Sequence, residues 1–540
     1  MTKAAILAFL KEYPKRPSTY YAYGTAGFRF EIDDKYATCI FIRAGLVAYA
    51  RAVFLGRAVG LCITASHNPV KDNGVKIIDP DGGMLAPSWE TIAAKVANAE
   101  TPEQCIEILS NICGDKLFHS KSEVILARDT RPHSKRLEDA AKEAISKIGG
   151  TPHSIGITTT PQLHFVVMTK NGMGYNKHFP PTLEGYSDCL VKSYKDLVDG
   201  TEPARKPIQI DCSNGVGALS FPGIADSLKD CGFNYSLINA DVQDHERLNE
   251  KCGAEHVQKT QSPPANVSPS SNTRFASFDG DADRIVFFSI EPKFRLFDGD
   301  KIACLMAYFI KEHIKVLFPN ESDVSIGTVQ TAYANGSSSK FLKEVLRVDA
   351  PFVKTGVKHL HHKALDYDIG VYFEANGHGT CLFRPSFVEK LGELKDTPEK
   401  RRLLALTKIL NQATGDAFSD LLAVDAILRV LKFDEEKWEA LYSDLPSKQL
   451  KVKVQDRSVV ETTEDETRCI RPQALQDRLD SAVKNIPSGR VFVRPSGTED
   501  VVRVYAEAAS QEDAEALANA ASEAIMEEAG GIPDSKRMKV

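Results

Sequence analysis

The feature that most constrains the fold is a recurring unit in which a nearly continuous apolar run ends at a polar or glycine-containing turn. Such runs are predicted to be strands over residues 60–64, 123–127, 207–211 and 368–373. Strands that are apolar at almost every position are typical of parallel or mixed sheets covered by helices on both faces. In these sheets ligands bind at the loops beyond the carboxyl ends of the strands. The sequence therefore predicts an α/β fold with its functional groups in those turns.

The length of the chain predicts several domains. At 540 residues it is long enough for three or four domains of about 150 residues each. Breaks are predicted over residues 171–207 and 433–447, and a strand follows over residues 450–454. We predict four units, which comprise residues 1–180, 181–297, 298–440 and 441–540.

Composition excludes several classes of protein. Hydrophobic residues make up 42%, charged residues 26%, and the net charge is −6, which gives no electrostatic reason to expect nucleic acid as a partner. The start of the chain lacks the pattern of a signal peptide, and no run approaches about 18 apolar residues. We therefore expect a cytoplasmic protein that does not bind membranes.

The cysteines and a histidine cluster do not indicate a zinc site. The chain has eleven cysteines and no Cys-x-x-Cys, so we expect reduced, mostly buried thiols without a disulfide framework. His359, His361 and His362 lack carboxylates at ligand spacing. A polar helix or loop is expected there.

A carboxylate triplet is the best candidate for a metal site. Asp279, Asp281 and Asp283 alternate with small residues between strands predicted at 274–278 and 285–290. Carboxylates at i, i+2 and i+4 in such a loop can converge on one hard cation, and Mg²⁺ is the expected ion. A calcium-binding EF-hand loop would need Gly at its sixth position and Glu at its twelfth, where this chain has Arg284 and Ile290. A solvated acidic turn is the alternative.

A serine loop supplies a group that can carry phosphate. The sequence Thr64-Ala65-Ser66-His67-Asn68-Pro69 follows a predicted strand, and together with the metal loop it suggests phosphoryl transfer through Ser66. His67 is expected either to donate to the transferring phosphoryl oxygen or to cap its own loop. Arg29, Lys76 and Arg284 lie on or beside glycine-containing turns and could face phosphate, although most such cations are surface residues. The chain has no Walker loop, and Ser66 lies outside any Gly-x-Ser-x-Gly elbow.

Two further loops have the side chains needed to bind a sugar phosphate. Residues 494–500 lie between strands predicted at 490–493 and 501–505, and their Arg, Ser, Gly and Thr are equipped for a phosphate monoester. An ordinary hairpin turn is the alternative. Residues 374–380 bring Glu374, Asn376 and His378 to a strand end, where they could contact sugar hydroxyls. A simple strand-end turn is the alternative there.

In this order, the serine, metal, sugar and phosphate loops resemble those of the α-D-phosphohexomutase family, over residues 23 to about 505. The chain is most similar to the eukaryotic branch that acts on N-acetylglucosamine (GlcNAc) phosphates. The resemblance implies an α/β protein of four domains, in which three related α/β domains with mixed sheets precede a smaller C-terminal α+β domain. Each domain would contribute one loop to a central cleft.

The resemblance also implies a reaction and its cofactors. GlcNAc 6-phosphate and GlcNAc 1-phosphate would be interconverted through a phosphoserine and a bisphosphate, as a step of UDP-GlcNAc biosynthesis. Mg²⁺ would be the metal, and a hexose or GlcNAc bisphosphate would be an activator. The partner would be a small amino-sugar phosphate, and the oligomeric state stays open. A general phosphoglucomutase or phosphomannomutase, a sugar phosphatase and a non-catalytic sugar-phosphate-binding protein are the alternatives.

Residue roles follow from the same resemblance. Ser66 would be phosphorylated, and its phosphoryl oxygen would bind Mg²⁺ with Asp279, Asp281 and Asp283. The transferring group would be surrounded by Arg29, His67 and Lys76. Apart from the resemblance, we expect Arg284 to offset transition-state charge and Lys76 to act as the general base. The sugar would contact Glu374, Asn376 and His378, and the distal phosphate would contact Arg494, Ser496, Gly497, Thr498 and Arg503. Asn376 is the candidate for recognising the acetamido group, because an amide both donates and accepts.

One departure from the family concerns strand order. A segment resembling residues 125–131 precedes the serine loop in most of the family, but it follows the loop in this chain. We therefore expect a rearranged first sheet, as in the acetylglucosamine branch. For this reason no site role is assigned to Arg128 or Arg131.

Overall fold

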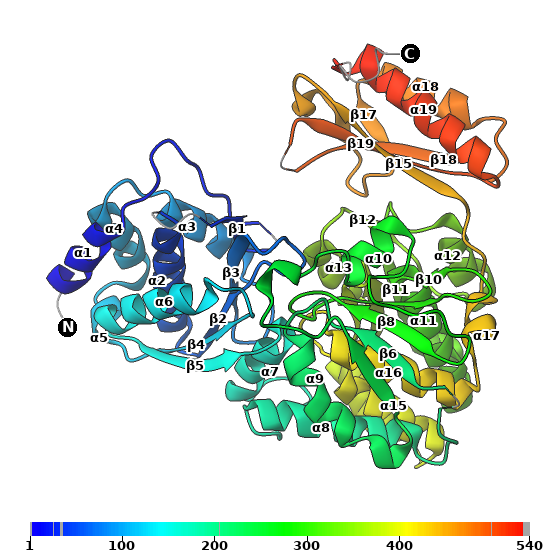
Figure 1. Cartoon of the computed structure of the whole chain (residues 1–540), viewed down its shortest axis with the longest axis horizontal. Helices are drawn as coiled ribbons and strands as arrows, with labels where there is room; N and C mark the ends of the chain where they lie inside the picture. Colours follow the sequence, from blue (N-terminus) through cyan, green and yellow to red (C-terminus); the bar gives the residue numbers. More distant parts are fainter. Residues whose placement is uncertain (1–2, 25, 33–35, 205, 498, 533–540) are drawn as a thin grey trace. The chain divides into compact units, whose positions relative to one another are not determined.

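The computed structural model describes residues 3–24, 26–32, 36–204, 206–497 and 499–532 (Figure 1). Its internal contacts divide the chain into two units. Unit 1 contains residues 1–298, 376–382 and 390–432, and unit 2 contains residues 299–375, 383–389 and 433–540. The basic tail from residue 533 onward lies outside the described residues.

The first sheet of unit 1 is mixed, with strand order β1-β3-β2-β4-β5. β2 pairs in parallel with β4, and β4 with β5, whereas β3 runs antiparallel to β1 and β2. The serine loop therefore joins two antiparallel neighbours at the carboxyl end of β2. The strands are β1 Phe28–Glu31, β2 Val59–Ile63, β3 Asp72–Ile78, β4 Glu123–Arg128 and β5 Thr151–Ile157.

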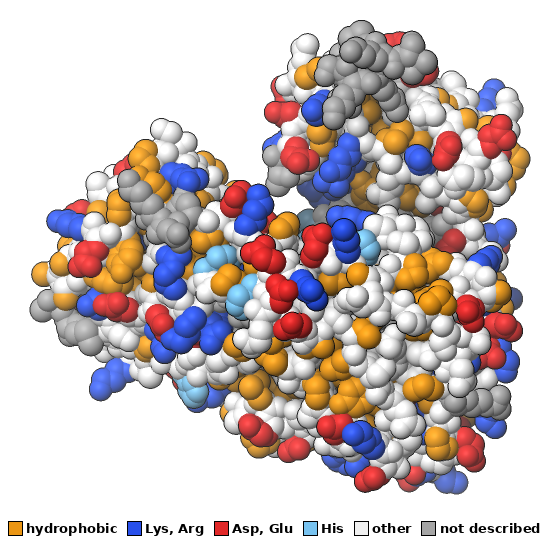
Figure 2. All heavy atoms as spheres, viewed as in Figure 1, with side chains coloured by type: hydrophobic (Ala, Val, Ile, Leu, Met, Phe, Trp, Pro, Cys, Tyr) orange, Lys and Arg blue, Asp and Glu red, His pale blue; other side chains and the backbone are white. Residues whose placement is uncertain are grey.

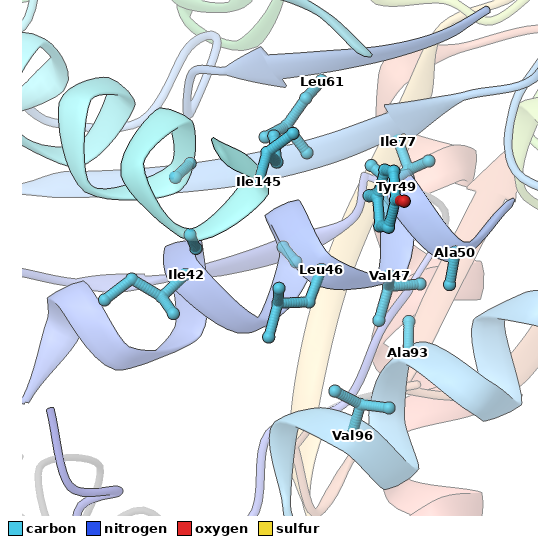
Figure 3. Packing of buried hydrophobic residues seen from close by; sticks show 14 of the residues in the cluster. Ile42, Leu46, Val47, Tyr49, Ala50, Leu61, Ile77, Ala93, Val96 and Ile145 are labelled. Carbon is cyan, nitrogen blue, oxygen red and sulfur yellow. The ribbon is translucent and has the colours of Figure 1, made fainter. Parts of the chain in front are cut away.

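Helices cover both faces of this sheet. Leu61 on β2 points toward α2 and α6, where it lies near Leu46 and Ile145 (Figure 3). The opposite face meets α7, because a Cβ at Gly60 would lie 2.8 Å from Val167 on that helix. The helices of this region are α1 Lys3–Glu12, α2 Ala37–Leu55, α3 Pro87–Ala97, α4 Pro102–Cys113, α5 Lys116–His119, α6 Ser134–Ile148 and α7 Thr160–Lys170.

Helix α2 is the most apolar long helix of the first sheet region. By length and composition it is long and apolar enough to cross a membrane, although Arg43 and Arg51 interrupt its apolar run. However, 89% of that window is buried inside the structure, between α6 and α3. A helix that is apolar on all sides is expected where neighbours surround it.

The second sheet of unit 1 carries the metal loop. Its strand order is β10-β9-β8-β6-β7; β6 is parallel to β7 and β8, and β9 is antiparallel to β8 and β10. The strands are β6 Ile208–Asp211, β7 Tyr235–Ile238, β8 Arg274–Phe278, β9 Ile285–Ser289 and β10 Arg295–Phe297. The metal loop is the short connection between β8 and β9.

The remaining elements of unit 1 surround this second sheet. α8 contacts α9, α15 and α16, and α10 contacts β8 and β9. The elements are α8 Leu183–Val198, α9 Gly217–Asp226, the short 3₁₀ helices η1 Lys229–Cys231 and η2 His245–Arg247, α10 Ala254–Thr260, α15 Pro398–Ile409 and α16 Ala417–Leu431. β14 Gly379–Phe383 begins in unit 1 and ends in unit 2.

The first part of unit 2 is a parallel α/β layer in which β11 lies between β12 and β13. Helices α11 and α13 contact both β11 and β13. The elements are α11 Gly299–Leu317, η3 Glu321–Asp323, β11 Ile326–Thr331, α12 Gly336–Lys340, the π-helical turn η4 Phe341–Leu346, β12 Phe352–Val353, α13 Val357–Ala364, β13 Ile369–Phe373 and α17 Glu435–Glu439. Helix α14 Pro385–Glu393 begins in unit 2 and ends in unit 1.

The second part of unit 2 is a small α+β layer. Its sheet is antiparallel with order β15-β19-β18, and its core is shared with α18 and α19. The phosphate loop is the β18–β19 connection. The elements are β15 Ser447–Lys453, η5 Arg457–Val459, β16 Glu461–Thr462, β17 Cys469–Arg471, α18 Gln473–Val483, β18 Arg490–Pro495, β19 Val501–Glu507 and α19 Gln511–Glu528.

These findings confirm the α/β class and the mixed sheets of the first two layers. In the first sheet β4 follows the serine loop in the chain and pairs with β2, and its rearrangement relative to the rest of the family stays a prediction. All eleven cysteines are free, and all but Cys231 are buried, as expected. The histidine cluster lies on the short helix α13. Acidic and basic side chains are interspersed on the face shown in Figure 2.

Candidate active site

Ser66 lies in a constrained position directly after β2. It is 1% exposed and has a positive φ of 50°, a conformation that is uncommon for a residue other than glycine. Its amide donates to Thr64 Oγ1 at 2.9 Å. Its carbonyl accepts from Arg131 and from Asn249, each at 2.9 Å. A strained backbone held by several neighbours is typical of functional sites.

The hydroxyl of Ser66 points at the metal loop. Ser66 Oγ donates to Asp279 Oδ2 at 2.6 Å and lies 3.3 Å from His67 Nδ1. The serine and the carboxylate come from different sheets and are 213 residues apart. The structure therefore brings together the two loops that the sequence joined only by their chemistry.

The metal loop is folded around Asp279. Asp279 Oδ1 accepts from the amides of Asp283 and Arg284 at 3.0 and 3.2 Å. The carboxylates of Asp279, Asp281 and Asp283 are buried and offer oxygen atoms that lie within 4.8 Å of one another. Asp281 Oδ1 and Asp283 Oδ1 have no hydrogen-bond partner. Buried acceptors without donors fit a hard divalent cation, for which carboxylate oxygens are the usual ligands.

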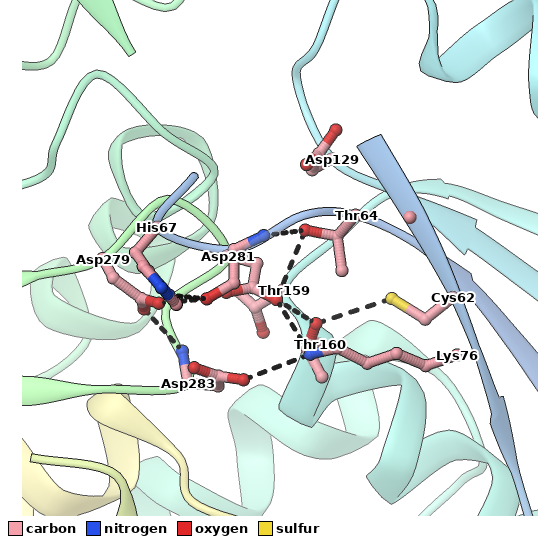
Figure 4. Close-up of polar contacts among 12 residues, drawn as sticks. Cys62, Thr64, His67, Lys76, Asp129, Thr159, Thr160, Asp279, Asp281 and Asp283 are labelled. Atoms are coloured by element: carbon pink, nitrogen blue, oxygen red, sulfur yellow. Dashed lines mark hydrogen bonds and ion pairs between the residues drawn. The ribbon is translucent and has the colours of Figure 1, made fainter. Parts of the chain in front are cut away.

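Asp281 is oriented by two hydroxyls. Its Oδ2 accepts from Thr160 at 2.5 Å and from Thr64 at 3.3 Å (Figure 4). Thr160 is the first residue of α7, whose N-terminus is closed by a capping box between Thr159 and Gln162. The sequence signature of that box is visible in the chain, but the hydrogen bond from Thr160 to Asp281 was not predicted.

Burial and charge shift the pKa values of Asp279 and Asp283 in opposite directions. Burial and the nearby Asp283 and Asp281 raise the pKa of Asp279 well above its ordinary value. Burial also acts to raise the pKa of Asp283, but Lys76 and His378 hold that pKa well below its ordinary value. The concentration of negative charge around Asp279 is what a bound cation would relieve.

Lys76 on β3 supplies a cation to the metal loop. Lys76 Nζ donates to Asp283 Oδ2 at 3.3 Å and lies 3.5 Å from Asp281 Oδ2. Burial acts to lower the pKa of Lys76, but the two carboxylates raise it. A lysine with a raised pKa is protonated at neutral pH, so this environment does not favour the general-base role predicted for Lys76.

Three further predicted residues surround the serine and metal loops. Arg29 donates to Asn68 Oδ1 at 3.0 Å, and its buried Nε has no hydrogen-bond partner. Arg284 donates to Glu255 at 2.7 Å and lies 3.9 Å from Asp279. Burial and the adjacent Arg284 lower the pKa of Arg29, and burial with both arginines lowers the pKa of His67, so the imidazole is neutral at physiological pH. Mutually repelling buried guanidiniums are well suited to an anion.

The sugar loop forms hydrogen bonds within itself and with the metal loop. His378 Nδ1 donates to the carbonyl of Asp283 at 2.8 Å, and the amide of His378 donates to Asn376 Oδ1 at 3.0 Å. His378 thus ties this loop to the metal loop, a contact that the sequence did not predict. Glu374 belongs to unit 2, and its role in sugar binding stays a prediction.

The phosphate loop in unit 2 is a tight turn. The Ser496 amide donates to the Val501 carbonyl at 2.9 Å, and Arg494 pairs across the hairpin with Arg503. Arg494 donates to Tyr333 and to Glu466 at 3.2 and 3.4 Å. The buried Nε of Arg503 has no hydrogen-bond partner, Gly497 is exposed, and Thr498 lies outside the described residues.

Arg131 lies against the serine loop, although no site role was assigned to it from the sequence. Its side chain is completely buried and pairs with Asp129 at 3.0 Å. It donates to the carbonyls of Ser66, Asn68 and Pro69 in the serine loop and to that of Asp72 at the start of β3. The available signal was its location just beyond the carboxyl end of the β4 strand. Arg128, in contrast, pairs with Glu138 at 3.0 Å and has no described contact with the serine loop.

Four models of known protein families match most of the chain. Models of phosphoglucomutase/phosphomannomutase domains match domain I over residues 45–104 and 94–179 and the C-terminal domain over residues 450–524. Models of phosphoacetylglucosamine mutase AMG1 match domain II over residues 203–286 and domain III over residues 298–433. The fold and the site thus define a protein of the phosphohexomutase class with four domains.

Individual relatives narrow this class. Phosphoacetylglucosamine mutase of Sus scrofa is 43% identical over 94% of both chains. A structure of Aspergillus fumigatus N-acetylphosphoglucosamine mutase with GlcNAc-6P and magnesium is 38% identical, with a TM-score of 0.91 over 97% of this chain and 99% of that one. A variant of that enzyme with glucose 1,6-bisphosphate has a TM-score of 0.90 at 38% identity, over 98% and 99%. The chain belongs to the phosphoacetylglucosamine mutase family.

Proposed function

We propose that this chain interconverts GlcNAc 6-phosphate and GlcNAc 1-phosphate through a phosphorylated Ser66. The observation that carries the proposal is the 2.6 Å contact between Ser66 Oγ and Asp279 Oδ2, within a set of three buried carboxylates. A hydroxyl beside a metal-binding loop is the arrangement that reversible phosphoryl transfer needs. The family relationship and the sugar-phosphate complexes of the relatives support the same reaction.

The reaction consists of two phosphoryl transfers. In the first, the bond between phosphorus and Ser66 Oγ breaks, and a bond forms to the free hydroxyl oxygen of the sugar phosphate, which gives a bisphosphate. The proton lost by the sugar hydroxyl is balanced by the proton that Ser66 Oγ takes up. The bisphosphate then turns round, and its other phosphoryl group passes to Ser66, so that the isomeric monophosphate leaves. The serine is the leaving group in one step and the nucleophile in the other.

Cationic side chains of this chain offset the charge on the transferring group. Arg29 and Lys76 lie beside the serine and metal loops and would face phosphoryl oxygens, and His67 would offer a neutral hydrogen-bonding group. The carboxylates of Asp279, Asp281 and Asp283 would hold Mg²⁺, which when bound supplies positive charge to a phosphoryl oxygen. Offsetting charge and fixing geometry are the main tasks of an enzyme in this chemistry.

The remaining roles follow the predicted division among loops. Glu374, Asn376 and His378 would contact the sugar, with Asn376 recognising the acetamido group. The distal phosphate would bind the loop that contains Arg494, Ser496, Gly497, Thr498 and Arg503. A hexose or GlcNAc bisphosphate would act as activator by phosphorylating Ser66. We propose a cytoplasmic location, as expected for an enzyme of sugar-nucleotide precursor synthesis.

A single incubation tests this function against its alternatives. The protein is incubated with GlcNAc 6-phosphate, Mg²⁺ and a trace of bisphosphate, and the two isomers and inorganic phosphate are quantified. We expect the 1-phosphate to form without stoichiometric release of phosphate, and Ser66→Ala to abolish its formation. Release of phosphate would indicate a phosphatase, and equal kcat/KM for glucose phosphate would indicate a general hexose mutase. Binding without turnover would refute catalysis.

A further inference from the structure

Two side chains from different domains donate to the same backbone carbonyls of the serine loop. Arg131 Nη2 donates to the carbonyls of Ser66 and Asn68 at 2.9 and 2.8 Å. Asn249 Nδ2 donates to the same two carbonyls at 2.9 and 3.1 Å. Each carbonyl oxygen has two lone pairs and can accept both bonds. The backbone of the proposed nucleophile is therefore held from two sides.

The two donors have different origins. Arg131 follows β4 of the first sheet and is fixed by its ion pair with Asp129, so it anchors the serine loop to its own domain. Asn249 lies between η2 and α10, in the domain of the second sheet. It has a φ of 59°, a backbone conformation that asparagine tolerates better than most residues. Asn249 is thus the side chain that links the serine loop to the other domain.

The backbone of Asn249 is itself connected to the metal loop. The Asn249 amide donates to the Ser213 carbonyl at 3.0 Å, just beyond β6. The hydroxyl of Ser213 in turn donates to the carbonyl of Phe278, the residue before Asp279. These two hydrogen bonds therefore connect the backbone of Asn249, through Ser213, to the residue that precedes Asp279.

Gly280 shows how closely these groups are packed. A Cβ on Gly280 would lie 2.6 Å from the Ser66 carbonyl oxygen and 3.0 Å from Asn249 Nδ2. The metal-loop backbone, the serine carbonyl and the asparagine amide therefore meet without room for a methyl group. Such packing transmits small displacements instead of absorbing them.

We infer that Asn249 is a positioning residue that holds the Ser66 loop in register with the Asp279 loop. Its side-chain amide holds the Ser66 backbone in the position that brings the free Ser66 hydroxyl to 2.6 Å from Asp279 Oδ2. The kinetic consequence rests on the proposed function, whereas the structural consequence does not. Positioning is decisive in phosphoryl transfer, since a displacement of about 1 Å can cost about 100-fold in rate.

Asn249→Asp is the test variant. It keeps the shape of the side chain and its tolerance of positive φ, but it places a carboxylate without a donor against two carbonyl oxygens. The rate constant for phosphoryl transfer from radiolabelled phosphoenzyme to GlcNAc 6-phosphate in a single turnover should fall by about tenfold or more, with KM changed by less than about threefold. A single-turnover rate constant does not depend on the fraction of folded enzyme. Amide hydrogen exchange in residues 64–75 should become faster in the same variant.

Asn266→Asp is the matched control. Asn266 also has a positive φ, 66°, and lies on the exposed surface of the same domain, where it donates to Asn239. This variant should retain the wild-type rate constant and the wild-type exchange of residues 64–75. If Asn249→Asp does not fold, Asn249→Gly serves instead, because glycine adopts this φ without cost and removes the donor.

The outcomes separate the inference from the proposed function. A wild-type single-turnover rate and wild-type exchange in both Asn249 variants would overturn the inference. Absence of phosphoryl transfer in the wild-type protein would overturn the proposed function, and the exchange measurement would still decide whether Asn249 holds the serine loop.

Discussion

At the scale of single residues, the two carboxylate oxygens of Asp281 have different environments. Oδ2 accepts from Thr160 and Thr64, whereas Oδ1 is buried without a hydrogen-bond partner. An unpaired buried carboxylate oxygen is costly unless something binds it. Replacement of Asp281 should therefore report on a bound cation.

Asp281→Asn should weaken Mg²⁺ binding because an anionic ligand becomes neutral. We expect the Mg²⁺ concentration for half-maximal activity to rise by at least about tenfold, since loss of even indirect metal contacts costs 10- to 100-fold in affinity. Chelation should abolish activity, and added Mg²⁺ should restore it. Asp230→Asn, at an exposed position on η1, is the control. An unchanged Mg²⁺ requirement would contradict the metal assignment.

Arg494 is the residue expected to bind the distal phosphate of the substrate. Arg494→Ala removes a charge-assisted contact worth roughly 1.5–3 kcal/mol, so affinity for the sugar phosphate should fall by about one to two decades. Bisphosphate should also escape more readily during turnover. Arg468→Ala, which breaks an exposed ion pair with Asp480 in the same domain, should change neither quantity. An unaltered KM without bisphosphate release in the Arg494 variant would contradict the role of this loop in binding the distal phosphate.

At the scale of elements, short loops between strands place the reactive groups. The β8–β9 loop approaches the serine loop so closely that Gly280 has no space for a side chain. The capping box of α7 likewise presents Thr160 to Asp281. Through these contacts the serine loop, the metal loop and the start of α7 pack directly against one another.

Gly280→Ala should separate the serine loop from the metal loop. The added methyl group meets backbone, so we expect a loss of about 1–3 kcal/mol in the free energy of unfolding and a large fall in kcat. Gly223→Ala is the matched control, because Gly223 lies in α9 and a Cβ added there would have no atom within 4 Å. Alanine should there be neutral or stabilising by up to about 1 kcal/mol. Calorimetry and kinetics on both variants decide the matter, and wild-type values for Gly280→Ala would refute the close approach.

At the scale of the whole molecule, buried acids determine how stability depends on pH. Asp416 caps α16 and is 1% exposed, and its carboxylate accepts from Tyr186 at 2.8 and 2.9 Å. Burial raises the pKa of Asp416 from 3.8 to about 6. Because the folded state favours the protonated acid, the stability contributed by this group is full below about pH 4 and is lost as the pH rises through about 6.

Asp416→Asn removes this titration while it keeps a carbonyl acceptor for Tyr186. Relative to wild type, the variant should gain free energy of unfolding as the pH rises from about 4 to about 7, by up to about 3 kcal/mol. Urea unfolding across this range measures the difference between the two proteins. Asp434→Asn, at the exposed N-cap of α17, controls for the change of charge. A difference that stays constant with pH would contradict the raised pKa.

The sequence by itself determined the strands of this protein and the functional loops that follow them. The strands that end at the serine, metal, sugar and phosphate loops are apolar runs followed by polar turns, and these patterns depend only on neighbouring residues. The spacing of Asp279, Asp281 and Asp283 likewise predicts one cation site without knowledge of the fold. The family resemblance, which rests on these loops, was sufficient to predict the architecture and the class of protein.

Only the tertiary structure decided how distant groups meet. The contact between Ser66 and Asp279, the hold of Arg131 and Asn249 on the serine loop, and the raised pKa of Asp416 all depend on residues from separate strands and helices. No local pattern encodes such contacts, because burial and hydrogen-bond geometry arise when the sheets and helices pack. For the same reason Lys76, predicted from the sequence to be a general base, lies in an environment that raises its pKa, because Asp281 and Asp283 lie beside it.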